Sequence, residues 1–172
     1  MSLASKWVIP PPKKTLVVGI ADKVVSNDPG AELVTYSLGS CLGITLYDPA
    51  KRIGGLLHVM LPNSAISAAK AASCPMMFVD TGVPRLFHAL YELGADRARL
   101  VLKVAGGAQF LDPDGVFNIG ERNQAALAEL LRRNGFSIQA EDLGGVSSRT
   151  LRLQLDSGRV QIHSPGRPPY SL

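Results

Sequence analysis

The chain has 172 residues, of which 46% are hydrophobic and 19% are charged, and its formal net charge is +4. This length and composition suit one globular domain with a sizeable core and exclude an intrinsically disordered chain. No apolar run approaches the roughly 20 residues that span a bilayer, and the first residues lack a secretory signal pattern, so we expect a cytoplasmic protein without membrane insertion.

The positive charge does not indicate nucleic-acid binding. Adjacent basic residues occur only at Lys13-Lys14, Lys51-Arg52 and Arg132-Arg133, and they lack the interleaved aromatic residues of a nucleic-acid surface. We therefore expect no nucleic-acid partner, and a mildly basic surface that fits an acidic protein. The two cysteines and three histidines are too dispersed for a zinc site, so we expect free thiols and no metal. The glycines at 106–107 lack the Gly-Lys-Ser/Thr ending of a phosphate-binding loop, and we expect no cofactor.

The first half of the chain predicts strands. Residues 1–13 have no clear period and are expected to form a flexible leader. The predicted strands span residues 15–20, 32–38, 42–47 and 53–61. Turn-forming residues at 48–52 join the last two, which should therefore be antiparallel neighbours, and Asp48 is expected to act as a turn residue.

The second half mixes helices and strands. Residues 62–75 are small and polar without a strong period and predict a mobile loop. Helices are expected up to Gly94, with Asp80 or Thr81 as the N-cap, and within 118–134. The later predicted strands span residues 100–105, 137–140, 150–155 and 159–162, with a hairpin turn at 156–158. We expect one domain over residues 14–163, a layered α+β or α/β sandwich, followed by a flexible tail at 164–172.

Cys41 and His58 form the strongest candidate for chemistry. Cys41 follows Gly39 and Ser40 at a bend before one predicted strand, and His58 lies in the apolar run of the next. An imidazole within hydrogen-bond reach can remove the proton of a thiol and later return it to a leaving group. Antiparallel strands would bring both side chains to one edge of a sheet. The alternative interpretation is a small core cysteine and a structural histidine.

Five segments, two of them containing Cys41 and His58, carry a resemblance to a known family. They are LGSCLGITLYDP (38–49), GGLLHVMLP (54–62), KVAGGA (103–108), NIGERN (118–123) and EDLGG (141–145). Their order and approximate spacing resemble those of the CheD family, the chemoreceptor glutamine deamidases. The resemblance covers about residues 16–163 and places the family's catalytic cysteine, histidine and threonine at Cys41, His58 and Thr35.

The resemblance implies a single α/β domain similar in architecture to deamidating bacterial toxins. It implies a protein-glutamine glutaminase that converts glutamines of methyl-accepting chemotaxis receptor cytoplasmic domains to glutamate through a thioester on Cys41. Backbone amides around Gly39 and Ser40 would bind the oxyanion, and the same acyl-enzyme would allow hydrolysis of glutamyl methyl esters. Thr35 would orient His58, although threonine on a strand is also explained by its β propensity.

Two other functions are alternatives. Relatives can associate with the CheC-type chemotaxis phosphatase and modulate it, so the chain could serve mainly as a binding partner. A thiol hydrolase of other substrates, such as a peptidase, is the third interpretation. The presence of Cys41, His58 and Thr35 together favours the deamidase, because a pure adaptor needs none of them.

Overall fold

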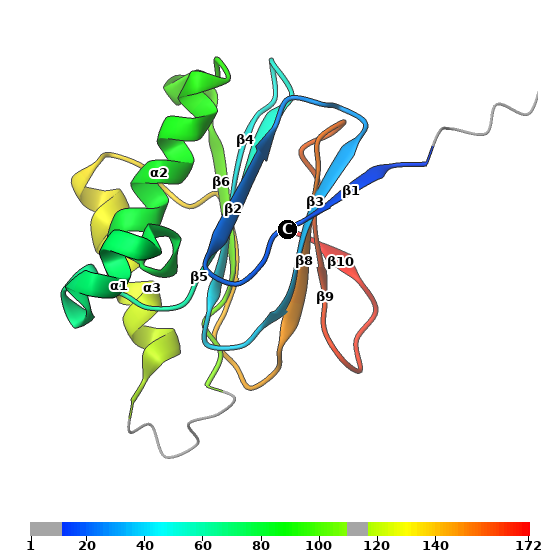
Figure 1. Ribbon diagram of the computed structural model, residues 1–172. Coiled ribbons are helices and arrows are strands. Elements are labelled where there is room, and N and C mark those ends of the chain that lie inside the picture. The colour runs from blue at the N-terminus through cyan, green and yellow to red at the C-terminus, as the bar shows by residue number, and fades with distance from the viewer. Residues whose placement is uncertain (1–11, 110–116) are drawn as a thin grey trace, which may run out of the picture.

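Two five-stranded sheets lie face to face, and three α-helices cover the outer face of one sheet, in the residues that the computed structural model describes, 12–109 and 117–172 (Figure 1). The layers are therefore helices, sheet and sheet. This mixed, layered α/β domain confirms the fold class that the sequence predicted. No helix in the described ranges is long and apolar enough to cross a membrane.

The elements have the following bounds. The first sheet contains, in spatial order, β1 (Lys14–Val17), β3 (Ala31–Leu38), β8 (Arg149–Gln154), β9 (Val160–His163) and β10 (Tyr170–Ser171). The second contains β2 (Asp22–Ser26), β5 (Ile53–Val59), β4 (Leu42–Asp48), β6 (Val101–Gly106) and β7 (Ala140–Leu143). The helices are α1 (Ala68–Ser73), α2 (Val79–Glu92) and α3 (Ile119–Arg133), with 3₁₀ segments η1 (Ser64–Ile66), η2 (Pro75–Met77) and η3 (Arg97–Arg99).

The central strands of the second sheet, β4 and β5, are buried along their whole length. They are covered by helices on one face and by the first sheet on the other, which explains their near-continuous apolar sequences. Leu42 and Ile44 of β4 and Leu57 and Val59 of β5 pack into the core under the helices. Because successive side chains of a strand face opposite ways, His58 faces the first sheet.

The pairing of β4 with β5 is antiparallel, as the turn residues predicted. The register places Gly43 opposite His58 and Leu42 opposite Val59, where the ladder ends. This register fixes the positions of Cys41 and His58 relative to each other, since Cys41 directly precedes Leu42.

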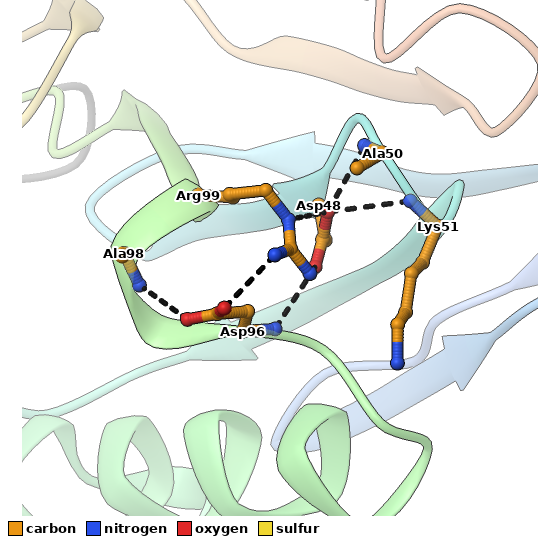
Figure 2. A network of polar contacts seen from close by, with 6 residues as sticks. All are labelled: Asp48, Ala50, Lys51, Asp96, Ala98 and Arg99. Carbon is orange, nitrogen blue, oxygen red and sulfur yellow. Dashed lines mark hydrogen bonds and ion pairs between the residues drawn. The ribbon is translucent and has the colours of Figure 1, made fainter.

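Asp48 closes the other end of this strand pair. Its carboxylate accepts hydrogen bonds from the backbone N–H groups of Ala50 at 3.0 Å and Lys51 at 3.3 Å, which is the predicted turn role. The same carboxylate also binds both Nε and Nη2 of Arg99, at 3.0 and 2.8 Å, and the N–H of Asp96 at 2.9 Å (Figure 2). The turn is thereby tied to η3, the segment that leads into β6.

The segment 62–75 is helical rather than a loop without structure, which corrects the sequence prediction. Asn63 and Ser67 cap η1 and α1 by accepting hydrogen bonds from backbone N–H groups. Asp80 is not the N-cap of α2, a position held by Phe78. Instead its carboxylate accepts hydrogen bonds from the N–H of Ser64 at 2.9 Å and from the Ser64 hydroxyl at 2.6 Å. Helical segments this short show no hydrophobic period, so they cannot be predicted from the sequence pattern.

Three strands also differ from expectation. Strand β2 was not predicted, and β7 begins at residue 140, where the predicted strand ended. The segment 164–172, expected to be flexible, contains β10, which pairs with β9 and whose Tyr170 hydroxyl bonds to Asp142. The predicted leader lies outside the described residues up to residue 11.

Candidate active site

The candidate residues come from both sheets. Thr35 belongs to β3 of the first sheet, His58 to β5 of the second, and Cys41 to the bend between β3 and β4. Thr35 and His58 are almost completely buried, with exposed fractions of 0% and 1%, whereas Cys41 is half-buried and packs on the core between the sheets. The site is therefore an inter-sheet site, which explains why residues distant in sequence can meet there.

Thr35 contacts the imidazole of His58 directly. Its Oγ1 lies 2.7 Å from Nδ1 of His58 and 2.9 Å from the carbonyl oxygen of Val18. A carbonyl oxygen only accepts, so the single hydroxyl hydrogen of Thr35 is donated to Val18. Thr35 Oγ1 must then accept the N–H of His58 Nδ1. This chain of two hydrogen bonds fixes the tautomer of His58 and leaves Nε2 with a free lone pair.

Nε2 of His58 is the nitrogen that can accept a proton. Nε2 of His58 is buried and has no hydrogen-bond partner among the described residues. Burial lowers the pKa of His58 to about 4, because the charged imidazolium is poorly solvated there. Burial likewise raises the pKa of the Cys41 thiol. At neutral pH the site therefore holds a neutral imidazole able to take a proton and a neutral thiol able to give one.

Cys41 is a diagonal neighbour of His58. Gly43 stands opposite His58 in the β4–β5 ladder, and Cys41 lies two residues before Gly43. Diagonal neighbours across an antiparallel pair have Cβ atoms roughly 7 Å apart, within reach of a histidine ring and a thiol that turn toward each other. The register agrees with the sequence prediction that the two residues lie at one edge of the sheet, but Nε2 of His58 makes no hydrogen bond to the Cys41 thiol.

The bend that carries Cys41 is held by its carbonyl groups. The carbonyl oxygen of Gly39 accepts the N–H of Ala108 at 2.8 Å, and that of Cys41 accepts the N–H of Gly107 at 2.8 Å. The amide N–H groups of Gly39, Ser40 and Cys41 donate to no backbone carbonyl in the described ranges. The bend thus uses its acceptors for structure and keeps its donors available.

Gly106 allows the 106–108 segment to pass close to the backbone of Cys41. Its φ of +114° lies in a region that side chains rarely adopt, and a Cβ there would overlap the carbonyl oxygen of Cys41. The sequence interpretation of the paired glycines as a bend that approaches another segment closely is confirmed.

Asn123 is the residue that the sequence interpretation missed. It is fully buried, and its Nδ2 donates to the carbonyl oxygens of Ser40 at 3.0 Å and Met60 at 2.9 Å. A signal did exist: Asn123 precedes the buried Leu127 and Leu131 at intervals of four, so a polar residue stands at a core position of a helix.

The other ionisable candidates do not join this site. His88 is exposed on α2 and pairs with Glu92 at 3.4 Å, and His163 is exposed at the end of β9. The thiol of Cys74 donates weakly to the carbonyl of Ala21, at 3.7 Å. Within residues 12–109 and 117–172, no group of three or more His, Cys, Asp or Glu side chains is arranged to hold a metal ion.

Comparison with known proteins gives a consistent result. The family model described as CheD chemotactic sensory transduction matches residues 60–164. The probable chemoreceptor glutamine deamidase CheD 2 of Anaeromyxobacter dehalogenans is 50% identical over 149 residues, which cover 87% of this chain and 94% of that protein. Probable chemoreceptor glutamine deamidases CheD of Solibacter usitatus and CheD 1 of Syntrophus aciditrophicus are each 45% identical, over 88% and 91% of this chain and 90% and 98% of those proteins.

Proposed function

The chain belongs to the CheD family, and on this basis we propose that it is a protein-glutamine glutaminase that converts glutamines of chemotaxis receptors to glutamate. The observation that carries the proposal is the hydrogen-bonded chain from Val18 through Thr35 to His58, which leaves Nε2 unprotonated on the strand that pairs with the one Cys41 precedes. We include a cytoplasmic location in the proposal, because the substrate would be the cytoplasmic domain of a receptor.

In the first half of the reaction, Cys41 attacks the side-chain carboxamide of a receptor glutamine. His58 Nε2 takes the thiol proton as the Sγ–C bond forms, because neither group is charged beforehand. The tetrahedral intermediate collapses, the C–N bond breaks, and the imidazolium gives its proton to the departing ammonia. A glutamyl thioester on Cys41 remains.

The second half hydrolyses this thioester. His58, neutral again, takes a proton from a water molecule, whose oxygen attacks the thioester carbon. When the intermediate collapses, the C–S bond breaks and the proton returns to the Cys41 sulfur. The receptor leaves with glutamate in place of glutamine. A glutamyl methyl ester would give the same acyl-enzyme with methanol as the leaving group, so we include ester hydrolysis in the proposal.

The oxyanion of both intermediates needs hydrogen-bond donors that are already in place. We assign this role to the amides around Gly39 and Ser40, together with that of Cys41. The assignment is supported by the bend itself, whose carbonyl groups at Gly39 and Cys41 are held by Ala108 and Gly107 while its amides donate to no backbone carbonyl among the described residues.

Thr35 is proposed to orient His58 rather than to stabilise its charge. A hydroxyl that accepts the Nδ1 proton fixes the ring and its tautomer, but it compensates an imidazolium less than a carboxylate would. The alternative role, a binding partner of a CheC-type phosphatase, gives no reason for this oriented base, so the site favours the enzyme.

The proposal is tested by incubating the protein with the cytoplasmic fragment of a chemotaxis receptor and following glutamine-to-glutamate conversion by mass spectrometry. The wild-type protein should convert specific glutamines, and Cys41→Ala should convert none because the covalent route is lost. Cys74→Ala is the matched control and should retain wild-type activity. Full activity of a folded Cys41→Ala variant would disprove the nucleophile.

A further inference from the structure

Asn123 occupies a buried position where a leucine would be more favourable for stability. The buried face of α3 carries Leu127 and Leu131 at the next two turns, and Asn123 is as buried as they are. Burying an amide in an apolar core costs free energy unless its groups are hydrogen-bonded. Its Oδ1 is buried without a partner among the described residues, so one part of that cost is not recovered. The side chain must therefore be judged by what its Nδ2 does.

The Nδ2 group joins the two segments that carry the proposed nucleophile and base. One acceptor is the carbonyl of Ser40, the residue before Cys41, and the other is the carbonyl of Met60, two residues after His58. Both partners can only accept, so the amide must present its nitrogen to both, and its orientation is unambiguous. The β4–β5 ladder ends at the Leu42–Val59 pair. Asn123 thus bridges the segments that extend β4 and β5, just beyond the last residue pair of the β4–β5 ladder.

Helix α3 is itself fixed against the bend that holds Cys41. A Cβ at Gly120 would overlap the carbonyl of Gly107, so the helix and the 106–108 bend are in direct contact. Gln124 adds a hydrogen bond from Nε2 to the same Gly107 carbonyl, at 2.9 Å. The helix therefore gives Asn123 a rigid base from which to hold Ser40 and Met60.

From these contacts we infer that Asn123 is a positioning residue, which fixes the spacing of the Cys41 bend and the His58 strand through its two hydrogen bonds. The inference rests on the proposed function for its catalytic consequence. This role differs from a purely structural one because the two bonds of Asn123 connect the Cys41 and His58 segments to each other. The bond of Gln124 reaches only Gly107, in the 106–108 bend.

The test compares Asn123→Leu with two matched controls. Gln124→Ala removes the hydrogen bond between α3 and Gly107 of the 106–108 bend. Asp48→Asn perturbs a buried polar group at the opposite end of β4. For each variant, kcat and KM are measured on a folded receptor fragment, and thermal unfolding is followed in parallel. We expect Asn123→Leu to lower kcat about 10²-fold with little change in KM, because small misplacements of reacting groups carry penalties of this order. Both controls should keep kcat within a few-fold of wild type.

A second measurement needs no receptor. The rate at which iodoacetamide alkylates Cys41 is measured against pH in the folded proteins. Release of the bend should expose the thiol and return its pKa toward the ordinary value, so Asn123→Leu should react faster and at lower pH than wild type. Faster alkylation together with slower turnover distinguishes lost positioning from lost nucleophilicity. A role confined to stability would lower the unfolding temperature and leave the alkylation profile unchanged.

The outcomes separate this inference from the proposed function. If the wild-type protein does not deamidate the receptor, the proposed function fails, and the alkylation profiles still decide the role of Asn123. A folded Asn123→Leu variant with wild-type kcat or a wild-type alkylation profile overturns the inference, as does an equal loss of kcat in both controls. If Asn123→Leu does not fold, Asn123→Ser replaces it, since its smaller side chain cannot clash, and wild-type kcat in that variant is equally contradictory.

Discussion

Thr35 receives its orientation from a backbone carbonyl, and this has a consequence for His58. Because the Val18 carbonyl takes the hydroxyl hydrogen, Thr35 can only accept from Nδ1, and the basic nitrogen is Nε2. A histidine of the opposite tautomer would present an N–H to Cys41 and could not remove its proton. The roles proposed for Thr35 and His58 thus rest on two hydrogen bonds.

Substitution at Thr35 tests this arrangement. Thr35→Val keeps the shape but leaves the Val18 carbonyl and the His58 Nδ1–H without partners, so we expect kcat to fall about 10²-fold, a typical contribution of a general base. The same unpaired groups should lower the free energy of unfolding by about 1–3 kcal/mol. Thr35→Ser retains the hydroxyl and should stay within about tenfold of wild type. Equal kcat for the valine and serine variants would show that the hydroxyl does not orient the base.

The lowered pKa of His58 predicts a pH profile. The base form is required for the first proton transfer, and its pKa lies at about 4 rather than at the usual 6.5. kcat/KM should therefore remain on a plateau through pH 6 and fall only as the pH approaches 4. An acidic limb centred near pH 6.5 in the folded protein would show that the imidazole is solvated in the working enzyme.

The lowered pKa of His58 also makes the free energy of unfolding depend on pH. The unfolded chain binds a proton at His58 more readily than the folded chain does, because the folded pKa is depressed. The contribution of neutral His58 is thus fully present above pH 6.5 and is lost as the pH falls toward 4. Urea unfolding of wild type and His58→Gln, compared at pH 7 and pH 5, separates this stability effect from the effect on turnover.

At this scale, the sequence could predict some residues and not others. Cys41 and His58 stand in a recognisable order around a short turn, so pattern and family resemblance were sufficient to select them. The acceptor role of Thr35 could not be predicted, because it depends on Val18 of a neighbouring strand segment. The sequence places Asn123 in the NIGERN segment but indicates no role for it, since only the packing of α3 against two distant carbonyl groups reveals one.

Among the elements, the β4–β5 turn depends on Asp48. Its carboxylate is fully buried, and the Arg99 guanidinium holds its pKa well below the usual range, with further help from three backbone N–H groups (Figure 2). A lowered carboxylate pKa contributes stability that is present above the unfolded pKa and lost as the pH falls below it. The turn should therefore become a weak point of the fold in acid.

Asp48→Asn should destabilise the protein without affecting the reaction. Losing one partner of an ion pair leaves the other charge uncompensated. Because the Arg99 side chain is 36% exposed and keeps its ion pair with Asp96, we expect a smaller loss of stability than for a fully buried pair. Asp48 lies at the far end of β4 from Cys41, roughly 20 Å away along an extended strand. Urea unfolding should therefore detect a lower free energy of unfolding, while kcat at a temperature where the variant is folded stays at the wild-type value. A parallel loss of kcat would indicate that the turn is coupled to the site.

The elements that sequence reasoning found are those with long, clear patterns. Strands β3, β4, β5 and β6 and helices α2 and α3 have continuous or periodic apolar residues. Strand β2 reads Asp-Lys-Val-Val-Ser and is an edge strand, so it has no such pattern, and α1 is held by caps rather than by an apolar face. Strand β10 contains only two residues and exists because β9 offers a free edge. In each of these cases the tertiary structure, rather than local propensity, determines the element.

At the scale of the whole molecule, the cavity that the described residues form beside Ser40 is smaller than a site for a complete small-molecule ligand, and neither Cys41 nor His58 lines it. A cavity of about 160 Å³ adjoins Ser40 and is lined also by Ala108, Gln109 and residues at the start of α3. Sites for drug-sized molecules typically enclose roughly 300–1,000 Å³. Such a space suits one side chain of a larger partner, whose remaining contacts must lie on the surrounding surface. Phe117, which lines the cavity, has an apolar side chain with an exposed fraction of 68% on this surface.

This distribution of contacts predicts the substrate selectivity of the proposed enzyme. If recognition depends on surface outside the cavity, binding energy from remote parts of the receptor is needed to position the glutamine, and truncated substrates lose kcat as well as affinity. The net charge of +4 should attract an acidic helical surface, and added salt screens that attraction. We therefore expect kcat/KM to be highest for a folded helical receptor fragment and to fall with salt, with much lower values for a short peptide around the same glutamine and almost no turnover of free glutamine.

Rates on the three substrates at two salt concentrations, with Cys41→Ala as the blank, test this directly. Equal turnover of all three would mean that the cavity alone determines recognition and that the protein is a general amidohydrolase.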